Sequence, residues 1–164
     1  MRPGEPYLEE SSVLVAVRIR GPSELSAETE LVLRLLNLTK INHAVILPND
    51  ESVRGMLRKV NAYVTWGEPC PELITKLLKR GDPNPGINFG EELSALGVSS
   101  LEELAQKLFR GEIEPSVVRR LFKPAFRLHP PRGGFKGSTK RPIGQKGVLG
   151  YAGKEIAGLL RAMC

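Results

Sequence analysis

Apolar positions in the first 68 residues alternate between short runs and helical stripes. Val13–Val17 is an unbroken apolar run whose strand continues to Arg20 and stops at Gly21-Pro22, which predicts a buried strand. His43–Leu47 and Tyr63–Trp66 are two further short runs typical of strands. Leucine and valine recur at helical spacing between these runs. The pattern predicts β-α-β-α-β over residues 13–68, a two-layer unit with helices packed on a sheet.

The two helices within this unit have recognisable ends and faces. The first, over residues 25–38, places Leu31, Leu35 and Leu38 on one stripe, with Val32 and Leu36 beside it. The second begins after a cap at Asn49 or Asp50. Its expected inward positions are Val53, Met56, Leu57 and Val60.

Residues 69–121 form a helical region in this interpretation. Pro71 suits the first turn of a helix that stops at Gly81, and residues 82–90 are expected to be a loop. Ser100 and Glu103 form a capping box for a helix over residues 101–109 that stops at Gly111. A short helix follows Pro115.

The charge of the chain is divided unevenly. The formal net charge is +6, and residues 122–164, called the basic segment below, contain nine of the 24 basic residues but only Glu155 among the 18 acidic ones. Proline and glycine recur in this segment, so we expect an irregular, extended strap that ends in a short helix over residues 154–163. We expect the core to fold without the segment. Such an asymmetry favours a polyanionic partner over a merely solubilising tail.

Several classes of protein are disfavoured by the sequence. It contains no apolar run near the length of a membrane span and no secretory signal in residues 1–12, an N-terminal extension, so we expect a cytosolic protein. The two cysteines form no CxxC pair, and we expect no disulfide, metal or cofactor. Neither histidine has an acid–base partner nearby, and Glu155 follows Gly153-Lys154 where a P-loop needs serine or threonine. We therefore expect no catalysis and no small-molecule substrate.

The glycine repeat at positions 144, 147, 150 and 153 has two interpretations. It is typical of a tightly bent backbone, and it would also permit close approach of the backbone to a phosphate or ribose. Two GXXG sequences in the basic segment resemble the loop of a KH domain, but prolines flank them, and we give that match little weight.

The most informative pattern covers residues 122–146, where basic residues alternate with a few aromatic ones. Cations spaced along an extended chain can each meet a different RNA phosphate. Because aromatic residues make up only 5% of the chain, recognition of structured RNA by shape and phosphate is favoured over base stacking. The basic residues of this stretch are Lys123, Arg127, Arg132, Lys136, Lys140, Arg141 and Lys146.

A second candidate surface lies on the first unit. Arg54 and Arg58 share one helix face, and Lys59 is adjacent. Arg18 and Arg20 leave the first strand on one side of its pleat. Each of these two patches could equally be an ordinary solvated face.

Five stretches of the sequence resemble a known family. They occur in family order and lie between residues 13 and 163, and the last of them is long and specific. On these residues the chain resembles large-subunit ribosomal protein thirty in its longer archaeal form, related to eukaryotic large-subunit protein seven. The stretches are Ala16–Gly21 (AVRIRG), Ile41–Val45 (INHAV), Arg54–Val60 (RGMLRKV), Tyr63–Gly67 (YVTWG) and Phe126–Phe135 (FRLHPPRGGF).

The resemblance implies an α+β fold: a ferredoxin-like βαβαβ core with a three-stranded antiparallel sheet. The residue pattern alone leaves the strand directions open and leans towards parallel crossovers. The resemblance also implies a structural constituent of the large ribosomal subunit, in the cytoplasm, that binds 23S-type rRNA, with 5S rRNA as a second candidate, beside neighbouring ribosomal proteins. The quoted family stretches include neither residues 1–12 nor residues 82–98, and the roles of these two parts stay open. The RNA contacts carried over by family match are Arg20, Lys40, Asn42, His43, Arg54, Arg58, Lys59, Arg127, His129, Arg132 and Lys136; the residue pattern adds Lys140, Arg141 and Lys146.

Two alternatives belong to other classes. One is a regulatory RNA-binding module outside the ribosome, which sedimentation with large subunits would separate from a ribosomal constituent. The other is an RNA-processing or nucleotide-binding enzyme, which turnover by the purified chain would reveal.

Overall fold

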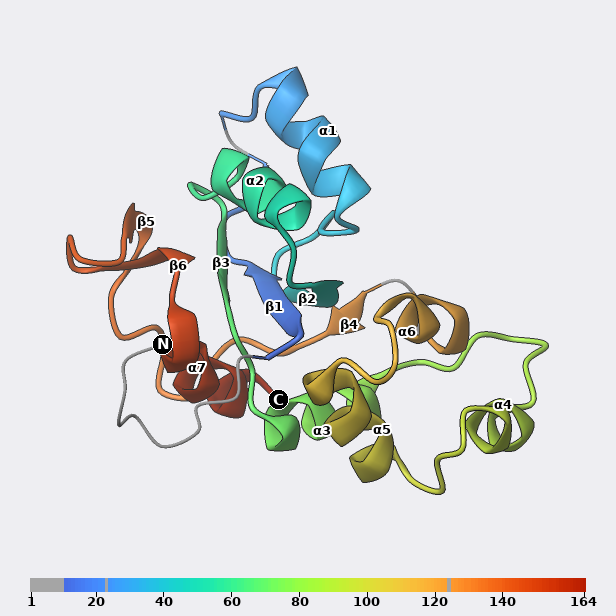
Figure 1. Ribbon diagram of the computed structural model, residues 1–164. Helices are drawn as coiled ribbons and strands as arrows, with labels where there is room; N and C mark the ends of the chain where they lie inside the picture. Colours follow the sequence, from blue (N-terminus) through green and yellow to red (C-terminus); the bar gives the residue numbers. More distant parts are fainter. Residues whose placement is uncertain (1–10, 23, 124) are drawn as a thin grey trace.

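The sheet lies between two layers of helices (Figure 1). The computed structural model describes residues 11–22, 24–123 and 125–164. The N-terminal extension expected for residues 1–12 therefore lies outside the described residues except for Ser11 and Ser12. Helices α1 (Ala27–Leu35) and α2 (Glu51–Lys59) cover one face of the sheet, and α3 (Pro71–Arg80), α5 (Leu101–Arg110) and α7 (Ile156–Met163) lie on the other side. The two layers predicted for residues 13–68 are present, and helices from the rest of the chain cover the second face of the sheet.

Strand β1 (Val13–Arg18) explains why the first apolar run is continuous. Its side chains alternate between the two faces: Val13, Val15 and Val17 pack with α3 and α5, whereas Leu14 and Ala16 pack with α1 and α2. A strand that is buried on both faces needs apolar residues at successive positions. Antiparallel neighbours lie on its two sides, β2 (His43–Pro48) and β3 (Val64–Gly67). The antiparallel arrangement implied by the family resemblance is confirmed for these three strands.

The first helix is shorter than the apolar pattern predicted, and its stripe faces differently. Ser26 caps α1 by accepting a hydrogen bond from the amide of Thr29. Val32, Leu33 and Leu36 are buried, but Leu31 and Leu35 are 53% and 59% exposed. Of the predicted stripe only Leu38 is buried, whereas Val32 and Leu36, which were expected beside the stripe, belong to the face that contacts the sheet. Of the two residues predicted to cap α2, Asn49 and Asp50, the cap is Asp50.

The second helical layer follows the predicted stop and start signals. α3 begins at Pro71 and ends before Gly81, and Ser100 caps α5 by accepting from the Glu103 amide. Gly111 ends α5 in the left-handed conformation, with φ of 83°. The stretch 82–90 is mostly loop, but Phe89 already begins a further helix, α4 (Phe89–Ala95). α4 stands away from the layer, and α6 (Ser116–Leu121) leads into the basic segment (Figure 1).

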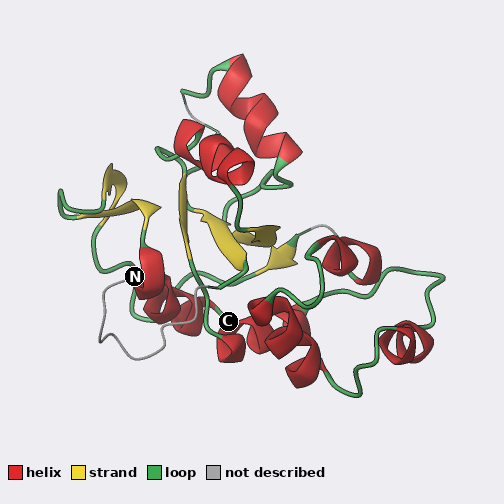
Figure 2. Cartoon of the chain, in the orientation of Figure 1, coloured by secondary structure: helices red, strands yellow, loops and turns green. Residues whose placement is uncertain are grey.

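The basic segment extends the sheet at its two edges. β4 (Phe126–Arg127) pairs antiparallel with β2, and β6 (Gly147–Tyr151) pairs parallel with β3. β5 (Ser138–Pro142) adds to β6 with an irregular register, so that the strand order is β4-β2-β1-β3-β6-β5 (Figure 2). The prediction of a three-stranded sheet was therefore wrong: the described part of the chain forms a sheet of six strands. Over residues 126–127, 138–142 and 147–151 the segment is strand, and not the irregular strap that was expected.

The end of the basic segment belongs to the hydrophobic core. Ile156, Leu160 and Met163 of α7 are at most 1% exposed and pack in the cluster that contains Val13, Val15 and Val17. A short 3₁₀ turn, η1 (Gly153–Glu155), joins β6 to this helix. Removal of the segment would uncover part of that cluster, and that the core folds without the segment stays a prediction. Among the described residues, none of the helices is long and apolar enough to span a bilayer.

Candidate nucleic-acid interface

The pairing of β2 with β4 joins predicted residues of the core to predicted residues of the basic segment. His43 and Arg127 are direct partners in this ladder. The amide of Leu128 donates to the carbonyl of Asn42 at 3.0 Å, and Asn42 itself has a φ of 62°, in the left-handed region. Lys40, at the start of the same turn, is exposed. Four predicted RNA contacts, Lys40, Asn42, His43 and Arg127, thus lie at one edge of the sheet.

His43 is held in an electropositive and partly buried position. Burial lowers the pKa of its imidazole, and the positive charges of Arg127, Lys40 and Arg18 lower this pKa further. Its Nδ1 atom is buried and has no hydrogen-bond partner among the described residues. The lowered pKa favours the neutral imidazole, and the ring stands among three cations, of which Arg18 also interacts with the carboxylate of Glu30.

Arg80 adds a cation to this edge that the sequence did not reveal. Its Nε and Nη2 atoms donate to the backbone carbonyl of Arg127 at 3.2 and 3.0 Å. The side chain of Arg127 is left exposed by these backbone contacts. Arg80 is the last residue of α3 and lies 47 positions from its partner, so sequence spacing held no signal for the contact.

Arg132 and Lys136 line a cleft in the basic segment. The cleft has a volume of about 440 Å³ and lies between residues 131–136, the β5–β6 pair and α7. The Arg132 amide donates to the carbonyl of Ala162 at 3.1 Å, which ties this loop to α7. Lys140, Arg141 and Lys146 are exposed on or beside β5 and β6, in the projecting left-hand part of Figure 1. They form no ion pair with an acidic residue of the described ranges.

His129 has a different setting from the one implied by the family match. Its Nδ1 lies 2.8 Å from the carbonyl oxygen of Pro130, and its Nε2 lies 3.2 Å from an oxygen of Cys164. Its backbone amide donates to Met163. The ring therefore contacts the end of α7 and connects the start of the basic segment to that helix. A direct RNA contact of this ring stays a prediction.

Of the patch predicted on the first unit, Arg58 and Lys59 remain on the surface. Arg58 lies 3.6 Å from Glu51, and Lys59 lies 4.0 Å from Glu28; all four side chains are at least half exposed. Such pairs are weak and can exchange for phosphate contacts. Arg20, the second residue after β1, has its guanidinium 5.3 Å from the centre of the Tyr63 ring.

Arg18 does not belong to that patch. It is 4% exposed, and its guanidinium donates to the carbonyl oxygens of Arg20 and Leu38, both at 2.9 Å. Burial lowers the pKa of Arg18, and Glu30 and Tyr63 oppose this effect. The expectation that Arg18 leaves the strand on an open face was wrong, because the turn after α1 closes over it.

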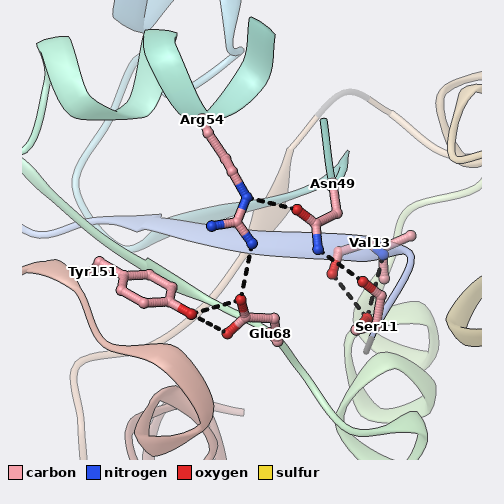
Figure 3. A network of polar contacts seen from close by, with 6 residues as sticks. All are labelled: Ser11, Val13, Asn49, Arg54, Glu68 and Tyr151. Carbon is pink, nitrogen blue, oxygen red and sulfur yellow. Dashed lines mark hydrogen bonds and ion pairs between the residues drawn. The ribbon is translucent and has the colours of Figure 1, made fainter. Parts of the chain in front are cut away.

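Arg54 is held by the fold itself (Figure 3). Its Nε donates to Asn49 Oδ1 at 2.8 Å, and its Nη2 lies 3.1 Å from Glu68 Oε1. Tyr151 Oη donates to the same carboxylate, at 2.6 and 2.8 Å from its two oxygens. Burial, and then Glu68, raise the pKa of Tyr151. Arg54 thereby links α2 to the ends of β3 and β6, and its contact with RNA stays a prediction.

The described residues contain no cluster of three or more His, Cys, Asp or Glu side chains that could hold a metal ion. The candidate interface consists of cations, which lie on the outermost strands of the mixed sheet and on the loop that connects these strands. The family model described as "Ribosomal protein L30p/L7e" matches residues 14–64.

Relatives cover nearly the whole chain. "Large ribosomal subunit protein uL30" of Desulfurococcus amylolyticus is 42% identical over 154 residues, which are 90% of this chain and 95% of the relative. The proteins of that name from Thermofilum pendens and Korarchaeum cryptofilum are each 40% identical and cover 93% and 95% of this chain, and 99% and 98% of their own length. The chain therefore belongs to the uL30 family of large ribosomal subunit proteins. This family is structural, and its members are not enzymes.

Proposed function

We propose that this chain binds large-subunit rRNA of the 23S type as a structural constituent of the cytoplasmic ribosome, with neighbouring ribosomal proteins beside it. One observation carries the proposal. The β2–β4 pairing places Lys40, Asn42 and His43 of the core beside Arg127 of the basic segment, as one cationic edge. A cationic edge of this kind is suited to phosphate contacts along folded RNA.

The remaining cations extend this edge along the basic segment. Arg132 and Lys136 lie at the cleft, and Lys140, Arg141 and Lys146 lie on or beside the projecting β5–β6 pair. Since β4 and β5 are at opposite ends of the strand order, the segment crosses the whole width of the sheet. An RNA bound along the segment would contact several phosphates at separated points, which supports recognition by shape.

Salt dependence of rRNA binding by the full chain tests the proposal. The quadruple variant Lys136→Gln, Lys140→Gln, Arg141→Gln and Lys146→Gln removes four exposed cations of the basic segment. Each lost phosphate contact should reduce the slope of log affinity against log salt by roughly 0.9, on the coefficient for duplex DNA. Affinity for purified large-subunit rRNA at low salt should fall at least about a hundredfold. The measurement is filter binding at several salt concentrations.

A control variant removes the same charge elsewhere. Lys76→Gln, Lys79→Gln, Lys107→Gln and Arg110→Gln changes four cations of α3 and α5, which lie outside the proposed surface. Its slope should stay close to that of the unchanged chain. Equal losses in the two variants would mean that net charge alone drives binding and would contradict the proposed surface. Parallel titrations with 5S rRNA alone decide whether that RNA is a second partner.

A further inference from the structure

The cleft beside α7 combines apolar walls with a cationic rim. Val148 and Leu159 supply half-buried apolar side chains, Ile156 of the core lies behind them, and Ile143, which is 39% exposed, also lines the cleft. The volume of about 440 Å³ lies within the range of small-molecule sites. Apolar surface that is open in this way is usually covered by a partner.

The rim restricts what that partner can be. Arg132 and Lys136 line the cleft, and both are exposed, while Glu155 is the acidic side chain of the lining. Between the two cations, Gly133 and Gly134 adopt φ of 79° and 80°, and a Cβ on either would meet no heavy atom within 4 Å. The loop is thus bare of side chains at the point where its backbone borders the opening, so that a bulky polar group can approach closely.

We propose that this cleft receives a single unstacked nucleotide of the bound RNA, and the inference rests on the proposed function. The base lies against Val148 and Leu159, and its phosphate lies between Arg132 and Lys136. Glu155 can accept a hydrogen bond from an exocyclic amino group of the base. Single-stranded loops and bulges of RNA offer such splayed bases to apolar or aromatic surfaces. An apolar protein side chain would fill the walls but would leave the two rim cations without a counter-charge.

Gly158 provides a variant that fills the cleft without disturbing the fold. It is exposed on α7, lines the cleft, and has no heavy atom within 4 Å of the position of a Cβ, outside the backbone of its own helix. Gly158→Leu therefore places a side chain in the opening, and leucine is favoured over glycine within a helix. Gly90→Leu is the matched control, because Gly90 lies in α4, and the nearest atom to a Cβ there is 3.7 Å away.

The experiment compares two oligonucleotides of equal charge, hexaadenylate and an abasic hexanucleotide. The unchanged full chain and Gly90→Leu should bind hexaadenylate about tenfold more tightly than the abasic strand, as expected for one buried base. Gly158→Leu should lose that preference and keep its affinity for the abasic strand. Methyl NMR signals of Val148, Ile156 and Leu159 should shift with hexaadenylate and not with the abasic strand.

The outcomes separate the inference from the proposed function. An unchanged base preference in Gly158→Leu, or no preference in the unchanged chain, overturns the nucleotide cleft while salt-dependent rRNA binding persists. If Gly158→Leu keeps the preference but enters large subunits poorly, the occupant is a protein neighbour, and the inference is wrong. Failure of the unchanged chain to bind large-subunit rRNA at low salt would instead overturn the proposed function.

Discussion

Arg54 Nη2 lies 3.1 Å from Glu68 Oε1, and the two side chains are only 24% and 14% exposed. The guanidinium is also 5.8 Å from the ring centres of Trp66 and of Tyr151. This pair is better shielded from water than the other ion pairs of the described residues. It connects α2 to the residue after β3, so Arg54 contributes to the fold whether or not it touches RNA.

Arg54→Ala should therefore lower the free energy of unfolding by about 2 kcal/mol, because Glu68 and Asn49 lose a charged donor in a partly buried place. Urea denaturation at pH 7 measures the change. The matched variant Arg58→Ala lies one turn along the same helix and removes an exposed pair, so its effect should stay within about 0.5 kcal/mol. Equal losses for the two arginines would contradict a structural role that is specific to Arg54.

His43 should make stability depend on pH in a defined direction. Burial, and then Arg127, Lys40 and Arg18, lower its pKa below the ordinary value of 6.5. The unfolded chain therefore binds a proton more readily than the native chain, and the unfolding free energy should fall as pH drops from about 7.5 towards the lowered native pKa. Below the native pKa both states are protonated, and this contribution stops changing.

His43→Asn should remove that part of the acid dependence, as denaturant titrations between pH 4.5 and 7.5 would show. The curves of unfolding free energy against pH should therefore differ in shape between the two proteins. Binding should respond in the opposite way: a phosphate beside His43 favours the protonated imidazole, so rRNA affinity should increase as pH falls. An rRNA affinity that changes with pH equally in the two proteins would mean that His43 does not face the RNA.

Local chemistry accounts for the elements that could be predicted from the sequence. Pro71 and Gly81 bound α3, and the Ser100 cap with Gly111 bounds α5, because helix ends depend on side chains within a few residues. The three central strands follow from apolar runs that are buried on both faces. In each case the residues that determine the element lie within or beside it in the sequence, so the element can be predicted from that segment alone.

The edges of the sheet could not be predicted in the same way. β4 is two residues long, and β6 contains two glycines, so neither shows a strand pattern. Their pairing depends on the exposed edges of β2 and β3, which lie far away in the chain. The same holds for the candidate site: Lys40, Asn42, His43 and Arg127 were each predicted, but only the β2–β4 register brings them together. Arg80 gave no signal in the sequence.

The phase of α1 supplies a direct test of that helix's orientation. Leu36 is 2% exposed, whereas Leu35 is 59% exposed. Leu36→Ala should lower the unfolding free energy by about 2–5 kcal/mol, because it leaves a cavity in the cluster with Leu14 and Leu57. Leu35→Ala should change it by less than about 0.5 kcal/mol. Comparable losses in thermal or urea denaturation would show that the helix is rotated from the described orientation.

The last prediction concerns Gly67, where β3 meets the turn before α7. A Cβ at this position would overlap the carbonyl oxygen of Gly153, and backbone atoms of the turn have no flexible end that could move aside. Gly67→Ala should therefore lower the unfolding free energy by about 1–3 kcal/mol, as overpacking does. It should also loosen β6, because Ala152 donates its amide to Trp66 next to this contact.

Gly55→Ala is the matched control. A methyl group there would meet no heavy atom within 4 Å outside its own helix, and alanine is favoured over glycine in a helix, so this variant should gain about 0.5–1 kcal/mol. Hydrogen exchange at the Ala152 amide distinguishes the expected local loosening from a global loss. If Gly67→Ala proved as stable as Gly55→Ala, the close approach of Gly67 to Gly153 would be wrong.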